Sequence, residues 1–266
     1  MKTTLFAAAL VAVLMPFAAA QDQDNDNDND RLPQASLDRE INIPRAAGTV
    51  ASGRLPQAQT PPTFCKPCLF YAGDFDSNAS DANGLANEVD IVVSTGAATY
   101  TPFIVPKGKT WTVTGLFTIE FMSDMNPDPK IAPYEIRKGI PKKGGNGGQL
   151  VCHGKRTATV IDTGICQGFG FECYAVEANH VKGCRLPSGK YWMTVIPYCT
   201  NKNDNNCDGW RAFVTNDDGA MNHRFGPLEP ANDSFFNSVF YGAVWEPSSE
   251  QQSSTRFSVG VEGTAK

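Results

Sequence analysis

The sequence lacks a second long apolar run after its first twenty residues, so no further segment is long enough to cross a bilayer as a helix. It has only three histidines, His153, His180 and His223, and none lies in a zinc-binding or nucleophile motif. A Gly-x-Ser-x-Gly sequence is absent, and the glycine-rich residues 144–148 lack the Lys-Ser/Thr pair of a phosphate-binding loop. We therefore expect no insertion into a membrane, and we recognise no catalytic motif.

A strong charge of either sign is also missing from the body of the chain. The formal net charge is −5, but it falls to −1 once Lys2 and the five Asp of residues 22–30 are set aside. A near-neutral chain without a basic stripe lacks the electrostatic footprint of a nucleic-acid-binding protein. We therefore expect neither nucleic acid nor an anionic membrane surface as a partner.

The N-terminus has the pattern of a cleavable signal peptide over residues 1–20. Lys2 precedes an apolar run over residues 5–17, and three alanines then supply the small side chains that a signal peptidase accepts before Gln21. We therefore expect a secreted protein that is extracellular or periplasmic.

Residues 21–62 differ in composition from the rest of the chain. They begin by alternating Asp with Asn or Gln, and they continue rich in Pro, Ala and Gln. Such a segment cannot build a core, so we predict a disordered linker, with a pro-segment or a partner-binding arm as the alternative. The folded domain is then expected over residues 63–266.

Eight cysteines follow the predicted signal peptide. An even number in an exported chain indicates disulfides. The spacing favours local pairs, namely Cys65–Cys68, Cys152–Cys166, Cys173–Cys184 and Cys199–Cys207. Neighbouring strands could exchange partners, so the connectivity stays open.

Cys65 and Cys68 form a CxxC motif that also occurs in redox proteins and metal sites. A redox pair needs its first thiol at a helix N-terminus, whereas the residues after Cys68 are typical of a strand. Haem attachment needs a histidine where Leu69 stands, and zinc would need a second pair of ligands, for which only Cys152 and His153 are adjacent. A structural disulfide is therefore the preferred interpretation.

From residue 64 onward, short aromatic and β-branched runs alternate with Gly, Pro, Asn and Asp, which is typical of many short strands. In residues 110–122, apolar side chains from Trp111 to Phe121 alternate with polar ones that include Thr118 and Glu120, as in a half-buried strand. Further strands are expected at 67–72, 88–94, 98–105, 132–138, 149–152, 157–163, 170–176, 190–198, 210–215, 235–242 and 256–262. About a dozen short strands without a helical period predict an all-β fold, an antiparallel β-sandwich of the jelly-roll type stapled by disulfides.

Residues 105–111 and 186–192 repeat one pattern, in which Pro and Gly precede Lys and a Trp follows. Each is expected to be a turn that leads into a strand, one in each sheet of the sandwich. Together with the flanking residues 103–117 and with residues 232–237, they resemble a group of largely uncharacterised secreted bacterial β-sandwich proteins, some of which carry surface-anchoring tails. The resemblance covers roughly residues 64–264. It implies the fold and brings no catalytic residue with it.

The polar segment 73–84 is a candidate calcium loop. Carboxylate and amide oxygens recur at alternate positions, and calcium prefers six to eight such ligands. The candidate ligands are Asp74, Asp76, Asn78, Asp81 and Asn83. The segment lacks the turn glycine and the bidentate glutamate of an EF-hand, and a polar loop with Asx turns would give the same pattern.

A candidate sugar site lies around the loop between Cys199 and Cys207. Aromatic faces stack on sugar rings, and amide or carboxylate groups bind sugar hydroxyls. The candidate residues are Trp210, Tyr198, Asn203, Asp204 and Trp192. The strand that holds Trp192 is apolar on both sides, and a central strand covered by a loop would also explain it, so Trp192 suits the core better.

Three functions remain in competition. The first is a non-catalytic extracellular protein that binds polysaccharide or a cell or matrix surface. The second is a structural or adhesive protein acting by protein–protein contact. The third is a polysaccharide hydrolase or lyase, which would need two convergent carboxylates, for which Glu120, Glu135 and Glu172 on expected strands are the candidates.

Overall fold

The computed structural model describes residues 41–42, 60–74, 83–90, 95–122, 129–140, 147–164, 172–199, 211–215, 223–227, 234–238, 244–250 and 256–266. The predicted signal peptide and nearly all of the predicted linker lie outside these residues. One short strand lies at residues 41–42, within the predicted linker, and the other described strands lie between residues 68 and 265.

Strands account for the regular structure of the described residues, and the all-β prediction is confirmed. They are β1 (Ile41–Asn42), β2 (Cys68–Tyr71), β3 (Asn83–Ala86), β4 (Val89–Asp90), β5 (Thr95–Met122), β6 (Ile131–Lys138), β7 (Gln149–Asp162), β8 (Glu172–Asn179), β9 (Arg185–Val195), β10 (Tyr198–Cys199), β11 (Arg211–Thr215), β12 (Phe235–Ser238), β13 (Val244–Pro247), β14 (Arg256–Phe257) and β15 (Val259–Ala265). One 3₁₀ turn, η4 (Ser248–Glu250), follows β13. Within this part of the chain, no helix has the length and apolar character needed to span a bilayer.

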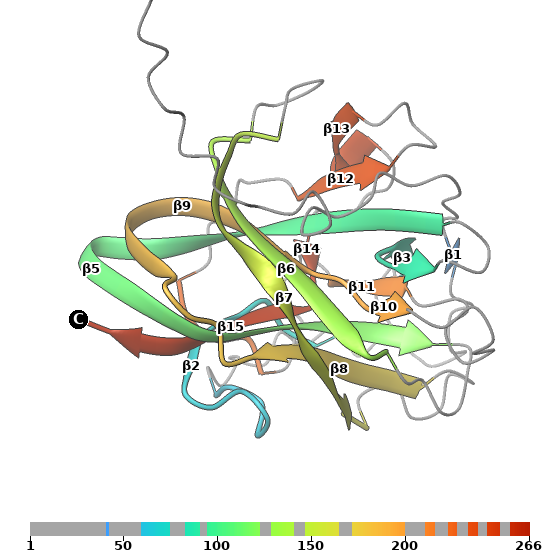
Figure 1. Cartoon of the computed structure of the whole chain (residues 1–266), viewed down its shortest axis with the longest axis horizontal. Helices are drawn as coiled ribbons and strands as arrows, with labels where there is room; N and C mark the ends of the chain where they lie inside the picture. The colour runs from blue at the N-terminus through green and yellow to red at the C-terminus, as the bar shows by residue number, and fades with distance from the viewer. Residues whose placement is uncertain are drawn as a thin grey trace, which may run out of the picture.

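Five strands close into a small antiparallel barrel. The long strand β5 pairs with both β8 and β9, while β8 pairs with β7, β7 with β6, and β6 with β9. Figure 1 shows the β6–β7 pair crossing the molecule, with β5 and β9 bending together at one end, beside the C-terminus. Further strands, including β15, β12 and β11, extend the sheet from β5. The closed arrangement means that the expected two-layer jelly roll is not confirmed.

The barrel interior holds the main hydrophobic core. This cluster takes side chains from each of the five barrel strands, such as Phe103 of β5, Tyr134 of β6, Cys152 of β7, Val176 of β8 and Met193 of β9. The largely parallel rings of Phe103, Trp111 and Tyr191 stack within it. Burial of this aromatic surface is the main force that closes the barrel.

A bulge in β5 changes the prediction for residues 110–122. The register between β5 and β15 shifts near Gly115, so the strict alternation of faces stops there. Trp111 and Val113 belong to the barrel core, whereas Phe117 and Ile119 belong to a second cluster on the outer side. The expectation of one continuous apolar face was therefore wrong, and so was the expectation that Thr118 and Glu120 face solvent.

The two segments with the repeated Pro-Gly-Lys pattern lie side by side. Val105 pairs with Gly189 and Trp111 with Leu186, so both segments belong to one strand pair, β5–β9. They mark the bend of that pair and do not lead into two separate sheets as expected. Gly108 has a φ of 77°, a left-handed conformation that glycine adopts without strain.

Two disulfides cross-link the described residues, and one corrects the sequence prediction. Cys65 pairs with Cys68 as expected, and β2 follows directly, in agreement with a structural role. Cys152 pairs with Cys184 across 32 residues, instead of with Cys166. The reason is topological: the turn between β8 and β9 packs against β7, where Arg156 Nε donates to His180 O at 3.1 Å. Cys173 is also disulfide-bonded, but the predicted Cys173–Cys184 pair does not form.

Candidate functional site

Three groups of hydrogen-bonded polar side chains bring together residues that are far apart in the sequence. The first surrounds the side chain of Asn87, between β3 and β4, which is 1% exposed. Its Nδ2 donates to Glu120 Oε1 at 2.6 Å and to the carbonyl oxygen of Val195 at 2.8 Å. Its Oδ1 accepts from Thr99 N at 3.1 Å and from Thr194 Oγ1 at 3.3 Å. One amide group thus links both halves of β5 to β9.

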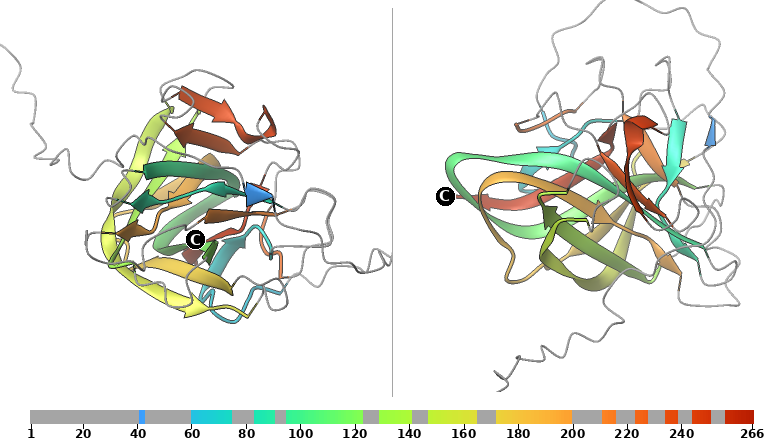
Figure 2. Two further views of the ribbon diagram at one scale, coloured as in Figure 1. Left: turned by 90° about the vertical axis from the view of Figure 1, so that its right-hand side faces the viewer. Right: turned by 90° about the horizontal axis from the view of Figure 1, so that it is seen from above.

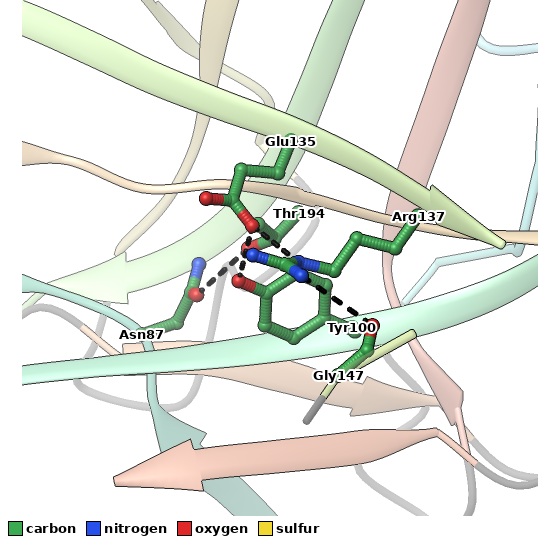
Figure 3. Close-up of polar contacts among 6 residues, drawn as sticks. All are labelled: Asn87, Tyr100, Glu135, Arg137, Gly147 and Thr194. Carbon is green, nitrogen blue, oxygen red and sulfur yellow. Dashed lines mark hydrogen bonds and ion pairs between the residues drawn. The ribbon is translucent and has the colours of Figure 1, made fainter. Parts of the chain in front are cut away.

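The carboxyl of Glu135 belongs to the same group, because Glu135 pairs directly with Thr194 in the β6–β9 ladder (Figure 3). Its Oε2 accepts hydrogen bonds from Tyr100 OH at 2.9 Å and from Arg137 Nε at 2.6 Å. The Arg137 guanidinium also lies 4.9 Å from the centre of the Trp245 ring, which caps the group. Burial, followed by the Glu135 charge, raises the pKa of Tyr100 well above its usual value. Tyr100 therefore acts as a neutral hydrogen-bond donor.

These contacts settle the places of two candidate catalytic carboxylates. Glu120 is fully buried and Glu135 is 2% exposed, so neither faces a groove. The sequence favoured solvent-facing charges at both positions, with a substrate groove as the alternative. The structure shows neither, because the β5 bulge turns Glu120 inward and the β12–β13 pair covers the sheet beside Glu135. The side chain of Glu172 lies outside the described residues. Both described carboxyls are hydrogen-bonded parts of the fold.

The second group lies on the outer face of β15, β5 and β8. The backbone N–H of Lys66 donates to Glu262 Oε1 at 2.6 Å, which ties the Cys65–Cys68 loop to β15. Gly115 leaves space for this carboxyl, because a Cβ there would overlap Glu262 Oε2 and lie 3.3 Å from Asn179 Oδ1. Asn179 Nδ2 in turn donates to Glu177 Oε2 at 2.8 Å. Two nearly buried carboxyls are thus held close to one another.

Both carboxyls hold their protons more firmly than usual. Burial is the main cause for Glu262, the nearby Glu177 adds to it, and the bond from Lys66 N opposes it, so the pKa of Glu262 rises to about 7. Burial also raises the pKa of Glu177, against the opposing hydrogen bond from Asn179. Double ionisation of the pair is therefore disfavoured near neutral pH.

This pair predicts that the protein becomes more stable as the pH falls from about 7 toward about 4.5. The folded state binds a proton on Glu262 through this range and the unfolded chain does not, so unfolding must release it. Replacing Glu262 by Gln keeps an acceptor for Lys66 N and removes the charge. Urea unfolding should show the E262Q variant about 2 kcal/mol more stable than the parent at pH 8 and nearly equal at pH 5.

The exposed carboxyl of Asp162 provides the matched control for this experiment. D162N should leave the difference in stability between pH 8 and pH 5 as it is in the parent. An unchanged pH dependence in E262Q would contradict the assignment of the raised pKa to this site.

The third group joins Tyr71, Asp74 and His223. Tyr71 is fully buried and donates to Asp74 Oδ1 at 2.8 Å, and Asp74 Oδ2 lies 2.6 Å from His223 Nδ1. His223 has a φ of 58°, an unusual backbone conformation, and is fixed by the adjacent backbone pairing of Tyr71 with Phe225. A buried carboxylate thus orients an exposed imidazole.

This group also bears on the predicted calcium loop. Asp74 is the one predicted ligand whose side chain is described, and each of its oxygens already has a protein partner. The side chains of the other predicted ligands, Asp76, Asn78, Asp81 and Asn83, lie outside the described part. No set of three or more His, Cys, Asp or Glu side chains suited to a metal ion occurs among the described residues. The calcium site stays a prediction.

The predicted sugar site is described only in part. Trp192 is 6% exposed and its ring packs edge-on against Phe235 at 5.9 Å, as its interpretation as a core residue requires. Tyr198 is half-buried and packs against the same cluster. Trp210, Asn203 and Asp204 lie outside the described residues, so the sugar site stays a prediction.

Sequence reasoning missed Asn87, Glu177, Glu262 and His223 as members of polar groups. For Glu262 there was one usable signal, because Gly115 interrupts an otherwise large-residue strand, and such a glycine indicates close approach of another group. The other three depend on pairings between distant segments. Asn87 and Val195, for example, are 108 residues apart.

Comparison with known proteins found no relative of this chain. No protein-family model matches the chain, no curated protein matches it, and no solved structure matches it. The resemblance to secreted bacterial β-sandwich proteins therefore stays a prediction.

Proposed function

We infer that this protein is an extracellular binding protein, without catalysis of its own, that attaches to polysaccharide through the exterior of its barrel. The two disulfides support an oxidising compartment outside the cytoplasm. Secretion through the predicted signal peptide and kinship with the bacterial β-sandwich group belong to the same proposal.

The observation that carries this proposal is the contrast between interior and exterior. Three described carboxyls of the barrel strands, Glu120, Glu135 and Glu177, are buried and hydrogen-bonded, whereas a glycosidase needs two carboxyls that are accessible to its substrate. The outer strand faces instead expose hydroxyl side chains, at Thr112 and Thr114 of β5 and at Thr157 and Thr159 of β7. Hydroxyls on a rigid sheet can exchange hydrogen bonds with sugar hydroxyls without reorganising the fold.

A polysaccharide panel tests the proposal. The full chain should be retained on at least one polymer in affinity electrophoresis through gels that contain cellulose derivatives, dextran, dextran sulfate or polygalacturonate. It should release no reducing ends from the polymer that retains it. The reduced and alkylated protein serves as the control, because it keeps the composition and loses the fold.

Two results would overturn the proposal. Migration unchanged by every polymer would remove polysaccharide binding. Release of reducing ends or of unsaturated products would show that the protein is an enzyme.

A further inference from the structure

The charges of the described side chains are segregated between the interior and the surface. Most of the acidic side chains are buried: Asp74, Glu88, Glu120, Glu135, Glu177 and Glu262. The basic side chains other than the 15% exposed Arg137 reach the surface at least in part: Lys66, Lys107, Lys109, Lys130, Lys138, Lys155, Arg156, Lys182, Arg185, Lys190, Arg224 and Lys266. The surface formed by the described residues is therefore mainly positive, although the net charge of the whole sequence is close to neutral.

Six of these cations gather at the end of the molecule where β5 and β9 bend. We call this end the basic end and define it by Lys107, Lys109, Lys182, Arg185, Lys190 and Lys266. Figure 1 and the right view of Figure 2 place the bends of β5 and β9 beside the C-terminus.

Backbone pairing confirms that these segments adjoin one another. Thr110 exchanges two backbone hydrogen bonds with Lys266, at 3.0 and 2.9 Å. In the β5–β9 ladder, Thr112 pairs with Arg185 and Ile104 with Lys190. The turn that carries Lys182 is joined to β5 by further backbone bonds, and the Cys152–Cys184 disulfide ties its end to β7. The cations therefore stand on a rigid, cross-linked framework.

Exposed or half-exposed acidic side chains of the described residues lie on other elements. Asp162 is the last residue of β7, where it pairs with Tyr174, and Glu246 and Glu250 belong to β13 and η4. The carboxyls nearest in register, Glu177 and Glu262, are nearly buried. Lys266 carries the terminal carboxylate beside its own ammonium group, so Lys107, Lys109, Lys182 and Arg185 supply most of the net positive charge. Like charges gathered in this way raise the local potential and attract a polyanion.

We propose that the basic end binds an acidic polysaccharide, one that carries carboxylate or sulfate groups along its chain. The proposal rests on the proposed function and names the chemical class of its ligand. Arg185 can hold a carboxylate or sulfate through two parallel N–H bonds, while the lysines supply flexible point charges. Thr110, Thr112 and Ser188 place hydroxyls between these cations, where they can bond to the sugar.

The other side chains of the basic end favour a polysaccharide over nucleic acid or a membrane. Its aromatic residues Trp111, Tyr191 and Trp192 are buried, so they offer no platform on which bases could stack. Its exposed uncharged side chains are small, as at Pro187 and Ser188, whereas a membrane-surface protein inserts large apolar groups. The basic end therefore offers positive charges and hydroxyl groups, which suit a hydrated sugar chain that carries negative charges.

The test compares matched polymers that differ in charge. Binding of the full chain is measured by biolayer interferometry to dextran sulfate and to dextran, and to polygalacturonate and its methyl ester. Dextran sulfate and polygalacturonate should bind, and their uncharged counterparts should bind at least tenfold more weakly. Raising NaCl from about 50 to about 300 mM should weaken binding further, because exposed charges are screened.

Variants then locate the site. The K107Q/K109Q double variant changes two exposed side chains of the β5 bend, where a Cβ added to Gly108 would meet nothing within 4 Å. It should keep the parent's melting temperature and lose roughly tenfold in affinity for both acidic polymers. K130Q removes a charge before β6, away from the basic end, and should stay within about twofold of the parent.

The outcomes separate the two proposals. Equal binding to charged and uncharged polymers, or a K107Q/K109Q variant that binds like the parent, would overturn the basic end and leave polysaccharide binding intact. Failure to bind any polymer would remove both. Tighter binding to duplex DNA or to phosphatidylglycerol vesicles than to either acidic polymer would also contradict the assignment of the ligand.

Discussion

Replacing Asn87 by leucine is expected to lower the free energy of unfolding by about 3 kcal/mol. The side chain makes four hydrogen bonds inside the protein. Without it, the carbonyl of Val195 and the buried carboxyl of Glu120 each lose a hydrogen-bond donor. Leucine is close to asparagine in size, so the cost is that of leaving buried polar groups with fewer partners. Urea unfolding followed by far-UV circular dichroism measures it.

A double-mutant cycle shows whether this cost belongs to the pair with Glu120. Adding E120L to N87L should recover part of the lost stability, because removing both partners costs less than removing one. T194V serves as the control and should cost less than about 1 kcal/mol, since its contact with Asn87 Oδ1 is a long 3.3 Å. Costs that simply add in the double variant would show that Asn87 and Glu120 act independently.

Replacing Arg137 by methionine is expected to destabilise the protein by about 3 to 5 kcal/mol. The change removes the 2.6 Å ion pair with Glu135 and leaves that carboxyl, 2% exposed, with Tyr100 as its donor among the contacts in Figure 3. It also removes the cation from the face of the Trp245 ring. Methionine replaces much of the arginine stem, so lost packing contributes little.

Two further variants show whether the loss of stability in R137M comes from the uncompensated Glu135 charge. E135Q with R137M should be more stable than R137M alone, because glutamine carries no charge and still accepts from Tyr100. R185M makes the same change at an exposed position and should cost less than about 0.5 kcal/mol. An R137M variant as stable as R185M would show that the buried ion pair contributes nothing.

Local sequence patterns predicted the class of the fold well. The alternation and punctuation of residues 64–266 indicated strands, and the described residues confirm an all-β chain with a Cys65–Cys68 disulfide. Both features depend on residues close together in the sequence, where period and spacing carry the information. The same reasoning placed Trp192 in the core correctly.

The architecture depends on pairings that local patterns do not encode. β5 selects β8 and β9 as partners from segments far along the chain, and this choice closes a barrel where a two-layer sandwich was expected. The bulge near Gly115 then moves Phe117 to the outer face and turns Glu120 inward. A strand period cannot reveal a bulge, because one extra residue shifts each later side chain to the other face.

The candidate binding surface was hidden for a related reason. Net charge averages over the chain, whereas binding depends on which charges reach the surface. Burial of Glu177 and Glu262 beside exposed Lys182 and Arg185 could not be inferred before the strands were paired.

Hydrogen exchange of the intact protein, with and without dextran sulfate, tests most directly whether an acidic polysaccharide binds at the basic end. Bound polymer should slow exchange at backbone amides of residues 106–110 and 182–190, the segments that carry most of its cations. Slowed exchange confined to other segments, such as residues 71–74 and 223–227 around His223, would contradict the account.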